Sequence, residues 1–345
     1  MKQVLERPQL TWGECYSSLP LALYGASKYT RKRAYGLPEF LAHTTFAFRT
    51  SVNRETFFTG AFDLEGVVAR TMDNLGFGAT FIHERDLKEL STELHDRALS
   101  MIRESIGRGI PVVGHNLENY EYGLIYGYED AEALLYICDI SAQEGKTLAY
   151  DQLGKRPLNG MPIGPELTLI ALKDRPEVPQ LEANRTPEQD GSYRRTLART
   201  LGYIIDHLTG EEPVVGGFEH GRGAFDAWIE AFQERKVHSI GNGYNIMLFA
   251  NARKSAIRFL LDSSQPDFFR VHDVRLQELM AQAAVHYMEA YAEWITLRHR
   301  FPFTQPIDTS SAEVVEPTVR QLLLIQELED KGLALFQQMR DVLQQ

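Results

Sequence analysis

The sequence predicts an α+β domain followed by an all-α helical domain. Residues 1–173 begin with helix-like patterns and then change to a run of short β-branched and aromatic segments, an order typical of α+β proteins. Residues 192–345 keep helical periodicity almost throughout. The segment between them, 174–191, carries three prolines, many charges and few apolar side chains, which indicates a linker.

Helices open the first domain. In Cys15–Ala26, leucine and alanine recur at helical spacing, and Pro20 lies in the first turns, where a missing N–H costs least. Asp63–Gly76 has an N-cap aspartate, an apolar stripe and a closing glycine, as a complete helix does. Asp86–Gly107 is typical of one or two further helices.

Strands follow the helices. Ile110–Val113 is a short β-branched strand behind a glycine. Tyr122–Tyr128 and Leu134–Cys138 are apolar segments on either side of a turn at 129–130, so we expect a hairpin. Leu167–Leu172 is a further apolar strand.

The second domain is expected to be a set of amphipathic helices without internal repeats. The helical segments are Ser192–Leu208, Gly223–Glu234, Tyr244–Leu261, Arg275–Arg300 and Ala312–Leu343. Before the second of them, the glycine-rich loop 217–223 suggests an anion site with Arg222 as its charge.

Composition excludes several classes of function. The 345 residues carry a net charge of −11, a poor match to nucleic acid or to an anionic membrane. No apolar run approaches the roughly 20 residues of a membrane span, and no signal peptide is visible. Two cysteines are too few for a disulfide scaffold or a thiolate zinc site. We therefore expect a reduced, cytoplasmic protein with no metal or other cofactor.

Cys15 is the first candidate nucleophile. It lies at the start of a predicted helix, where the partial positive charge of the helix end lowers the pKa of a thiol. The alternative is a buried small hydrophobic residue. A cysteine nucleophile also needs a base, usually histidine, and spacing singles out none of the histidines of the first domain. These are His43, His83, His95 and His115.

Three segments resemble the N-terminal domain of the butirosin-biosynthesis protein H family: Trp12–Gly25, Gly36–Val52 and Gly109–Asp139. The second domain is similar to the C-terminal region of that family at Gly223–Phe232 and Arg253–Leu261. The resemblance implies a papain-like cysteine fold, distantly similar to the double-glycine-leader peptidases. It also implies acyl transfer, because the founding member moves an aminoacyl chain from a carrier protein to an aminoglycoside.

The resemblance implies a catalytic site with one departure. The nucleophile position falls on Cys15 and the orienting aspartate on Asp139, but the catalytic histidine position falls on Glu121. A carboxylate beside the thiol raises its pKa, unless Glu121 itself takes up a proton and serves as a general acid. Two ways around the departure are open. Either His115, on the loop leading into this strand, swings in as the base, or the site binds without catalysing.

The sequence therefore leaves several functions open. The first is cysteine-dependent acyl transfer from a thioester or amide to an amine acceptor, through an intermediate in which the acyl group is bound to Cys15. Such a reaction would serve the biosynthesis of a small molecule or peptide, as in secondary metabolism. The second is a non-catalytic papain-like binding or accessory protein. A cysteine peptidase is the alternative within the enzyme class, and a structural or interaction protein is the remaining one.

Partner and substrate contacts are expected at a few positions. Tyr120 and Arg49 are candidate substrate-binding residues. Lys28, Arg31, Lys32 and Arg33 form a basic run suited to an acidic partner, such as an acyl carrier protein, or else a solvated turn. A small-molecule acyl donor and an amine acceptor are the other expected partners. An exposed apolar stripe around Leu322–Leu328 would favour an interaction surface or a homodimer.

Overall fold

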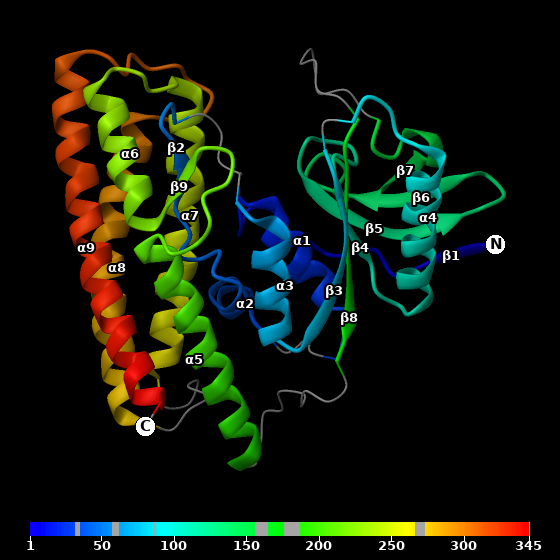
Figure 1. Ribbon diagram of the computed structural model, residues 1–345, viewed down its shortest axis with the longest axis horizontal. Coiled ribbons are helices and arrows are strands. Elements are labelled where there is room, and N and C mark those ends of the chain that lie inside the picture. The colour runs from blue at the N-terminus through cyan, green and yellow to red at the C-terminus, as the bar shows by residue number, and fades with distance from the viewer. Residues whose placement is uncertain are drawn as a thin grey trace. The chain divides into compact units, whose positions relative to one another are not determined.

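The computed structural model describes residues 1–31, 35–56, 62–85, 87–155, 165–175, 187–265 and 273–344, with side chains of residues 187–190 excepted. The chain forms two compact units (Figure 1). The first contains Met1–Tyr35 and Gly76–Glu182, and the second contains Gly36–Leu75 and Ala183–Gln345. Lys32, Arg33 and residues 176–186 of the predicted linker lie outside the described residues.

The predicted domain boundary is wrong for one segment. Gly36–Leu75, expected in the first domain, packs in the helical unit. Phe48 explains this placement, because its buried ring meets Tyr287 and Phe336 edge-on, with ring centroids 5.3 and 5.2 Å away. The segment contributes α2 (Leu37–His43), β2 (Ser51–Asn53) and α3 (Leu64–Asn74). The N-cap of α3 is the predicted Asp63, whose side chain accepts a hydrogen bond from the Gly66 N–H.

The first unit is built on a seven-stranded antiparallel sheet in the order β3-β8-β4-β5-β6-β7, and β1 pairs with the far end of β5. The predicted hairpin is β5–β6. The strands are β1 (Lys2–Val4), β3 (Phe77–Glu84), β4 (Val112–His115), β5 (Tyr122–Glu129), β6 (Leu134–Cys138), β7 (Lys146–Ala149) and β8 (Leu167–Asp174).

Two α-helices of this unit pack on the sheet, α1 (Ser18–Ser27) and α4 (Thr92–Gly107), and a short 3-10 helix, Tyr150–Gln152, follows β7. Buried apolar side chains of α4, among them Ile102 and Ile106, join those of the strands in one core. Burial of this apolar surface holds the strand ends in place. The α+β class is therefore confirmed, while the papain-like assignment stays a proposal.

The second unit is a set of long helices with a small two-stranded sheet, β2–β9. Three rings, those of Trp228, Phe249 and Trp294, meet in its core with centroids 5.7 to 5.9 Å apart. The elements are α5 (Pro187–Thr209), β9 (Phe218–His220), α6 (Gly221–Gln233), α7 (Ser239–Ser264), α8 (Val274–Arg300) and α9 (Ala312–Gln344). No helix of the described ranges is long and apolar enough to cross a membrane.

In this unit one expected boundary is corrected and one open condition, the exposure of the α9 stripe, is answered. The linker was expected to continue to residue 191, but α5 already begins at Pro187. Proline suits the start of a helix, because the backbone N–H that it lacks would have no helical partner at that position. The apolar stripe of α9 is mostly core, since Leu322 and Leu328 are buried. Only Leu323 and Leu324 of that stripe are exposed, at 48% and 41%.

Candidate functional site

Several polar side chains gather at one end of the sheet in the first unit. β4 ends at His115 and runs antiparallel to both β5 and β8. Its carboxyl end therefore lies beside the amino ends of those two strands. Tyr122 begins β5 and is the ladder partner of His115, while Glu166 directly precedes β8.

His115 and Glu166 form a buried pair. Nδ1 of His115 lies 2.5 Å from Oε1 of Glu166, and the two side chains are 8% and 5% exposed. Burial opposes ionisation of Glu166, but the hydrogen bond and charge interaction with His115, the charge of Arg85 and the hydrogen bond from Tyr120 together outweigh it, so the pKa of Glu166 is lowered from its ordinary value. An ionised Glu166 keeps a proton on Nδ1, and Nε2 is then the nitrogen that can accept one.

Two tyrosines surround the His115 ring. The rings of Tyr120 and Tyr122 each have their centroid 4.6 Å from the imidazole centroid, and the Tyr120 hydroxyl donates to Oε2 of Glu166 at 3.2 Å. Burial raises the pKa of Tyr122 to about 12, so its hydroxyl stays protonated at neutral pH. The candidate substrate residue Tyr120 is thus a partner of the His115–Glu166 pair.

The structure corrects the surroundings predicted for Cys15. The helix begins at Ser18, not at Cys15, because a helix from residue 15 would need the backbone N–H that Pro20 lacks. The Cys15 thiol lies within hydrogen-bond distance of the Ser17 carbonyl, at 3.3 Å, and the residue is 4% exposed. Burial raises the pKa of the thiol to about 12, and a backbone hydrogen bond with Ser17 only partly opposes this effect.

Glu121, at the expected histidine position, contacts Ser18. The Ser18 hydroxyl donates to the Glu121 carboxylate and accepts from the Tyr122 N–H at 3.1 Å. These two bonds join the start of α1 to the start of β5. Ser18, which makes both bonds, lies three residues after Cys15. The leading cause of the raised thiol pKa is burial, not the like charge of Glu121 that the sequence suggested.

Asp139 does not orient a base in this structure. Its carboxylate is fully buried and accepts four backbone N–H bonds of 2.8 to 2.9 Å, from residues 118, 119, 141 and 142. Both oxygens are therefore used to hold two loops at the end of β6. The neighbouring Gly123 is required by this packing, because a Cβ there would lie 2.5 Å from the Cys138 carbonyl oxygen.

The carboxylate that orients a histidine is instead Glu166, which the sequence analysis missed. Its only signal was a glutamate directly before an otherwise apolar strand. His115 also differs from expectation, because it is the last residue of β4 and not part of a loop.

Arg49, expected to bind substrate, is bound by Glu212 in the second unit. Its Nη1 and Nη2 lie 3.0 and 2.8 Å from the two Glu212 oxygens, and its side chain is 7% exposed. Arg70 also donates to this carboxylate, and so does Nδ1 of His207, which lies 2.9 Å from Oε2 of Glu212. The guanidinium of Arg49 is thus part of a buried ion network, which argues against a substrate role.

The described part of the basic run is engaged within the first unit. Lys28 donates to the Tyr35 carbonyl at 2.5 Å and its ammonium lies 4.2 Å from the centroid of the Tyr24 ring. The Arg31 backbone N–H donates to Asp174 at 3.0 Å. These contacts are typical of an ordered turn, and a docking role for the run stays a prediction.

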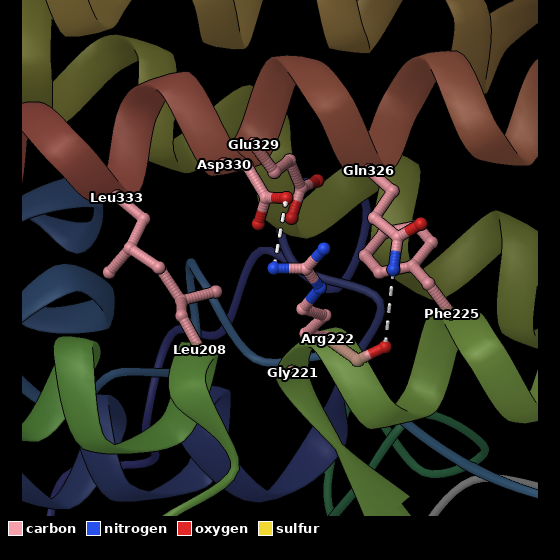
Figure 2. Close-up of a pocket in the computed structure, with 8 residues that line it drawn as sticks. All are labelled: Leu208, Gly221, Arg222, Phe225, Gln326, Glu329, Asp330 and Leu333. Atoms are coloured by element: carbon pink, nitrogen blue, oxygen red, sulfur yellow. Dashed lines mark hydrogen bonds and ion pairs between the residues drawn. The ribbon is translucent and has the colours of Figure 1, made fainter.

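A small pocket in the second unit lies where α5, α6 and α9 meet (Figure 2). Its cavity volume is only about 10 Å³, the space of roughly one water molecule. Arg222 was the expected charge of an anion site here, but its Nη1 lies 3.8 Å from the Asp330 carboxylate. Figure 2 draws this ion pair as a dashed line. Glu329 and Asp330 both line the pocket, and two carboxyl groups in its wall disfavour the binding of an anion.

Among the described residues, no group of three or more histidines, cysteines, aspartates and glutamates could hold a metal ion. No protein-family model matches the chain, and no curated protein matches it. The His115–Glu166 pair with its two tyrosines, close to the Cys15 segment through Ser18, is therefore the candidate site on geometry alone.

Proposed function

We propose that the first unit catalyses cysteine-dependent acyl transfer, with Cys15 as nucleophile, His115 as general base and Glu166 as the residue that orients the base. The acyl donor is a thioester or amide and the acceptor an amine. The observation that carries the proposal is the buried His115–Glu166 pair, in which the carboxylate engages Nδ1 and leaves Nε2 to accept a proton.

The contacts around the pair support its proximity to the nucleophile. The Tyr122 ring packs against His115, and the Tyr122 N–H donates to Ser18, three residues after Cys15. Ser17, the N-cap of α1, gives that helix no side-chain cap. The first amide groups of α1 are thus donors near Cys15 that suit a developing oxyanion.

The raised thiol pKa determines how such a site works. A thiol with a pKa of about 12 is about 10⁻⁵ ionised at pH 7, so a preformed thiolate does not carry the reaction. Like a serine hydroxyl, this thiol must lose its proton to a base as it attacks. A positioned histidine is therefore more important here than in a site with a preformed thiolate.

In the proposed reaction, the Cys15 proton passes to Nε2 of His115 while Sγ bonds to the donor carbonyl carbon. The tetrahedral intermediate collapses, the bond to the donor's leaving group breaks, and the leaving group takes the proton from His115. The acceptor amine then attacks the acyl-Cys15 carbonyl and gives a proton to His115. Release of the amide returns this proton to the Cys15 sulfur.

The test is trapping of the acyl-enzyme. Wild-type protein incubated with a short neutral acyl thioester is expected to gain one acyl group, placed on Cys15 by peptide mass spectrometry. Cys15→Ala removes this adduct. Cys138→Ala is the matched control, because burial also raises the Cys138 pKa to about 12 and that residue is 2% exposed. An adduct retained in Cys15→Ala would contradict the proposal.

The second candidate is a binding or accessory protein that keeps the same unit without catalysis. The observation that favours it is the deep burial of the Cys15 thiol. It predicts no acyl adduct and equal alkylation of Cys15 and Cys138 by iodoacetamide. Hydrolysis of a peptide amide through an acyl-Cys15 intermediate would indicate a peptidase instead.

A further inference from the structure

The loop between β4 and β5 carries Tyr120 to the candidate site. The two ends of this loop meet, because the Asn116 N–H donates to the Glu121 carbonyl at 3.0 Å. Asn116 has a φ of 56°, a left-handed conformation that asparagine tolerates better than most residues do. Tyr120 is left two positions before Tyr122, the ladder partner of His115. Both tyrosines therefore reach the same imidazole ring.

Contacts that do not involve the Tyr120 side chain hold this loop. The buried Asp139 carboxylate accepts hydrogen bonds from the Glu118 and Asn119 N–H groups at 2.8 and 2.9 Å. The side-chain oxygen of Asn119 in turn accepts a hydrogen bond from the Tyr120 N–H at 2.8 Å. Because these neighbours place the Tyr120 backbone, removing its hydroxyl leaves the position of the loop intact.

The side chain of Tyr120 contacts both members of the buried pair. Its ring meets the His115 imidazole edge-on, with an interplanar angle of 71°. Its hydroxyl donates to Oε2 of Glu166 at 3.2 Å, while Oε1 of the same carboxylate lies 2.5 Å from Nδ1 of His115. Each oxygen of the Glu166 carboxylate therefore has its own partner.

The second partner matters because the terminal torsion of a glutamate side chain is broad. One hydrogen bond leaves the plane of the carboxylate free to turn, whereas hydrogen bonds to both oxygens restrict it. Arg85 also favours the ionised form of Glu166 through its charge. A charge interaction has little preference for direction, so it does not replace the hydroxyl of Tyr120 in fixing the torsion.

We propose that Tyr120 is a positioning residue for the general base, because its hydroxyl fixes the Glu166 carboxylate in the orientation that keeps a proton on Nδ1 of His115. This inference rests on the proposed function and deepens it, since a neutral imidazole accepts the Cys15 proton at Nε2 only when Nδ1 carries the other proton. Without the hydroxyl, the carboxylate turns away from Nδ1 for part of the time. The imidazole then populates the form with its proton on Nε2, which has no lone pair there and does not act as the base.

The experiment is Tyr120→Phe in the full chain, with two measurements. The tautomer of His115 is determined at pH 8 by long-range proton–nitrogen correlation NMR on protein with isotope-labelled histidine, and His115→Gln assigns the signal. Wild type is expected to show the form protonated on Nδ1, and Tyr120→Phe a mixture of both forms. The initial rate of Cys15 acylation by a neutral thioester should fall by roughly tenfold, the effect of losing one hydrogen bond to a charged group.

Tyr136→Phe is the matched control. The Tyr136 hydroxyl also donates to a carboxylate of the first unit, Oε2 of Glu129 at 2.8 Å, on the β5–β6 hairpin. This variant should change neither the tautomer nor the acylation rate. The inference is overturned if the acylation rate of Tyr120→Phe is within twofold of that control. It is also overturned if the rate falls while the His115 tautomer stays that of wild type.

Failure of the proposed function gives a different result. No acyl adduct on Cys15 in wild type refutes acyl transfer, and the tautomer alone then tests the positioning. A single form protonated on Nδ1 in wild type that becomes mixed in Tyr120→Phe, and not in Tyr136→Phe, supports the role of the hydroxyl. An unchanged tautomer in Tyr120→Phe, or a wild type without the form protonated on Nδ1, overturns it.

Discussion

Glu212 is predicted to be the most sensitive single position for the stability of the second unit. Its carboxylate, 3% exposed, accepts hydrogen bonds from Arg49, Arg70 and His207. The first two come from the Gly36–Leu75 segment and the third from α5, so one side chain joins two distant parts of the chain. The change to test is Glu212→Gln, which keeps the shape and removes the charge.

The expected loss follows from what the substitution leaves behind. The Arg49 guanidinium, 7% exposed, would remain buried without its anionic partner. Removing one member of a buried ion pair typically costs 3–5 kcal/mol, because the other charge stays desolvated. For a unit of this size each kcal/mol lowers the melting temperature by roughly 2–4 °C, so the expected fall is about 6–20 °C.

The assay is thermal and urea unfolding followed by far-UV circular dichroism, to which the helices of the second unit contribute strongly. Glu211→Gln is the matched control, because Glu211 is the exposed neighbour with the same chemistry. If Glu212→Gln unfolds within about 1 kcal/mol of this control, the network does not stabilise the unit as argued, since breaking a buried pair should cost more than that.

Three further predictions follow from single contacts. Burial lowers the pKa of His207 to about 3, so between about pH 6.5 and pH 3 this histidine is protonated in the unfolded chain but not in the folded one. The free energy of unfolding, measured by urea titration, should therefore fall by about 2 kcal/mol from pH 7 to pH 5, and it should fall less in His207→Gln. Gly123→Ala should lower the melting temperature of the first unit, because its Cβ meets the Cys138 carbonyl oxygen, whereas an unchanged value would refute the close approach. Glu166→Gln should slow Cys15 acylation by about 10²-fold or more at pH 7, with circular dichroism unchanged, whereas an unchanged rate would remove Glu166 from the site.

Local sequence patterns predicted most elements because those elements follow periodicity and end signals. Leu134–Cys138 is a strand with the predicted bounds, and Asp63 caps its helix as expected. The start of α1 was misplaced because the apolar spacing continued back to Cys15, whereas the missing N–H of Pro20 sets the start. β1 was missed because three residues at the end of a chain give no periodic signal.

The candidate site was only partly predictable because it depends on the order of strands in the sheet. Cys15 and His115 were recognised as chemical groups, but Glu166 reaches His115 through the pairing of β8 with β4. No local pattern encodes such a pairing. The placement of Gly36–Leu75 in the helical unit is a long-range effect of the same kind, since its apolar stripe does not show which partner it will cover.

The central claim is that His115 removes the proton of a Cys15 thiol that hardly ionises by itself. The most direct measurement is the rate of Cys15 acylation by a neutral thioester at pH 7, in wild type and in His115→Gln. We expect the variant to be slower by about 10²- to 10⁴-fold, the usual contribution of a positioned base, with its rate rising tenfold per pH unit as hydroxide replaces the base. Equal rates and equal pH profiles for the two proteins would contradict the account.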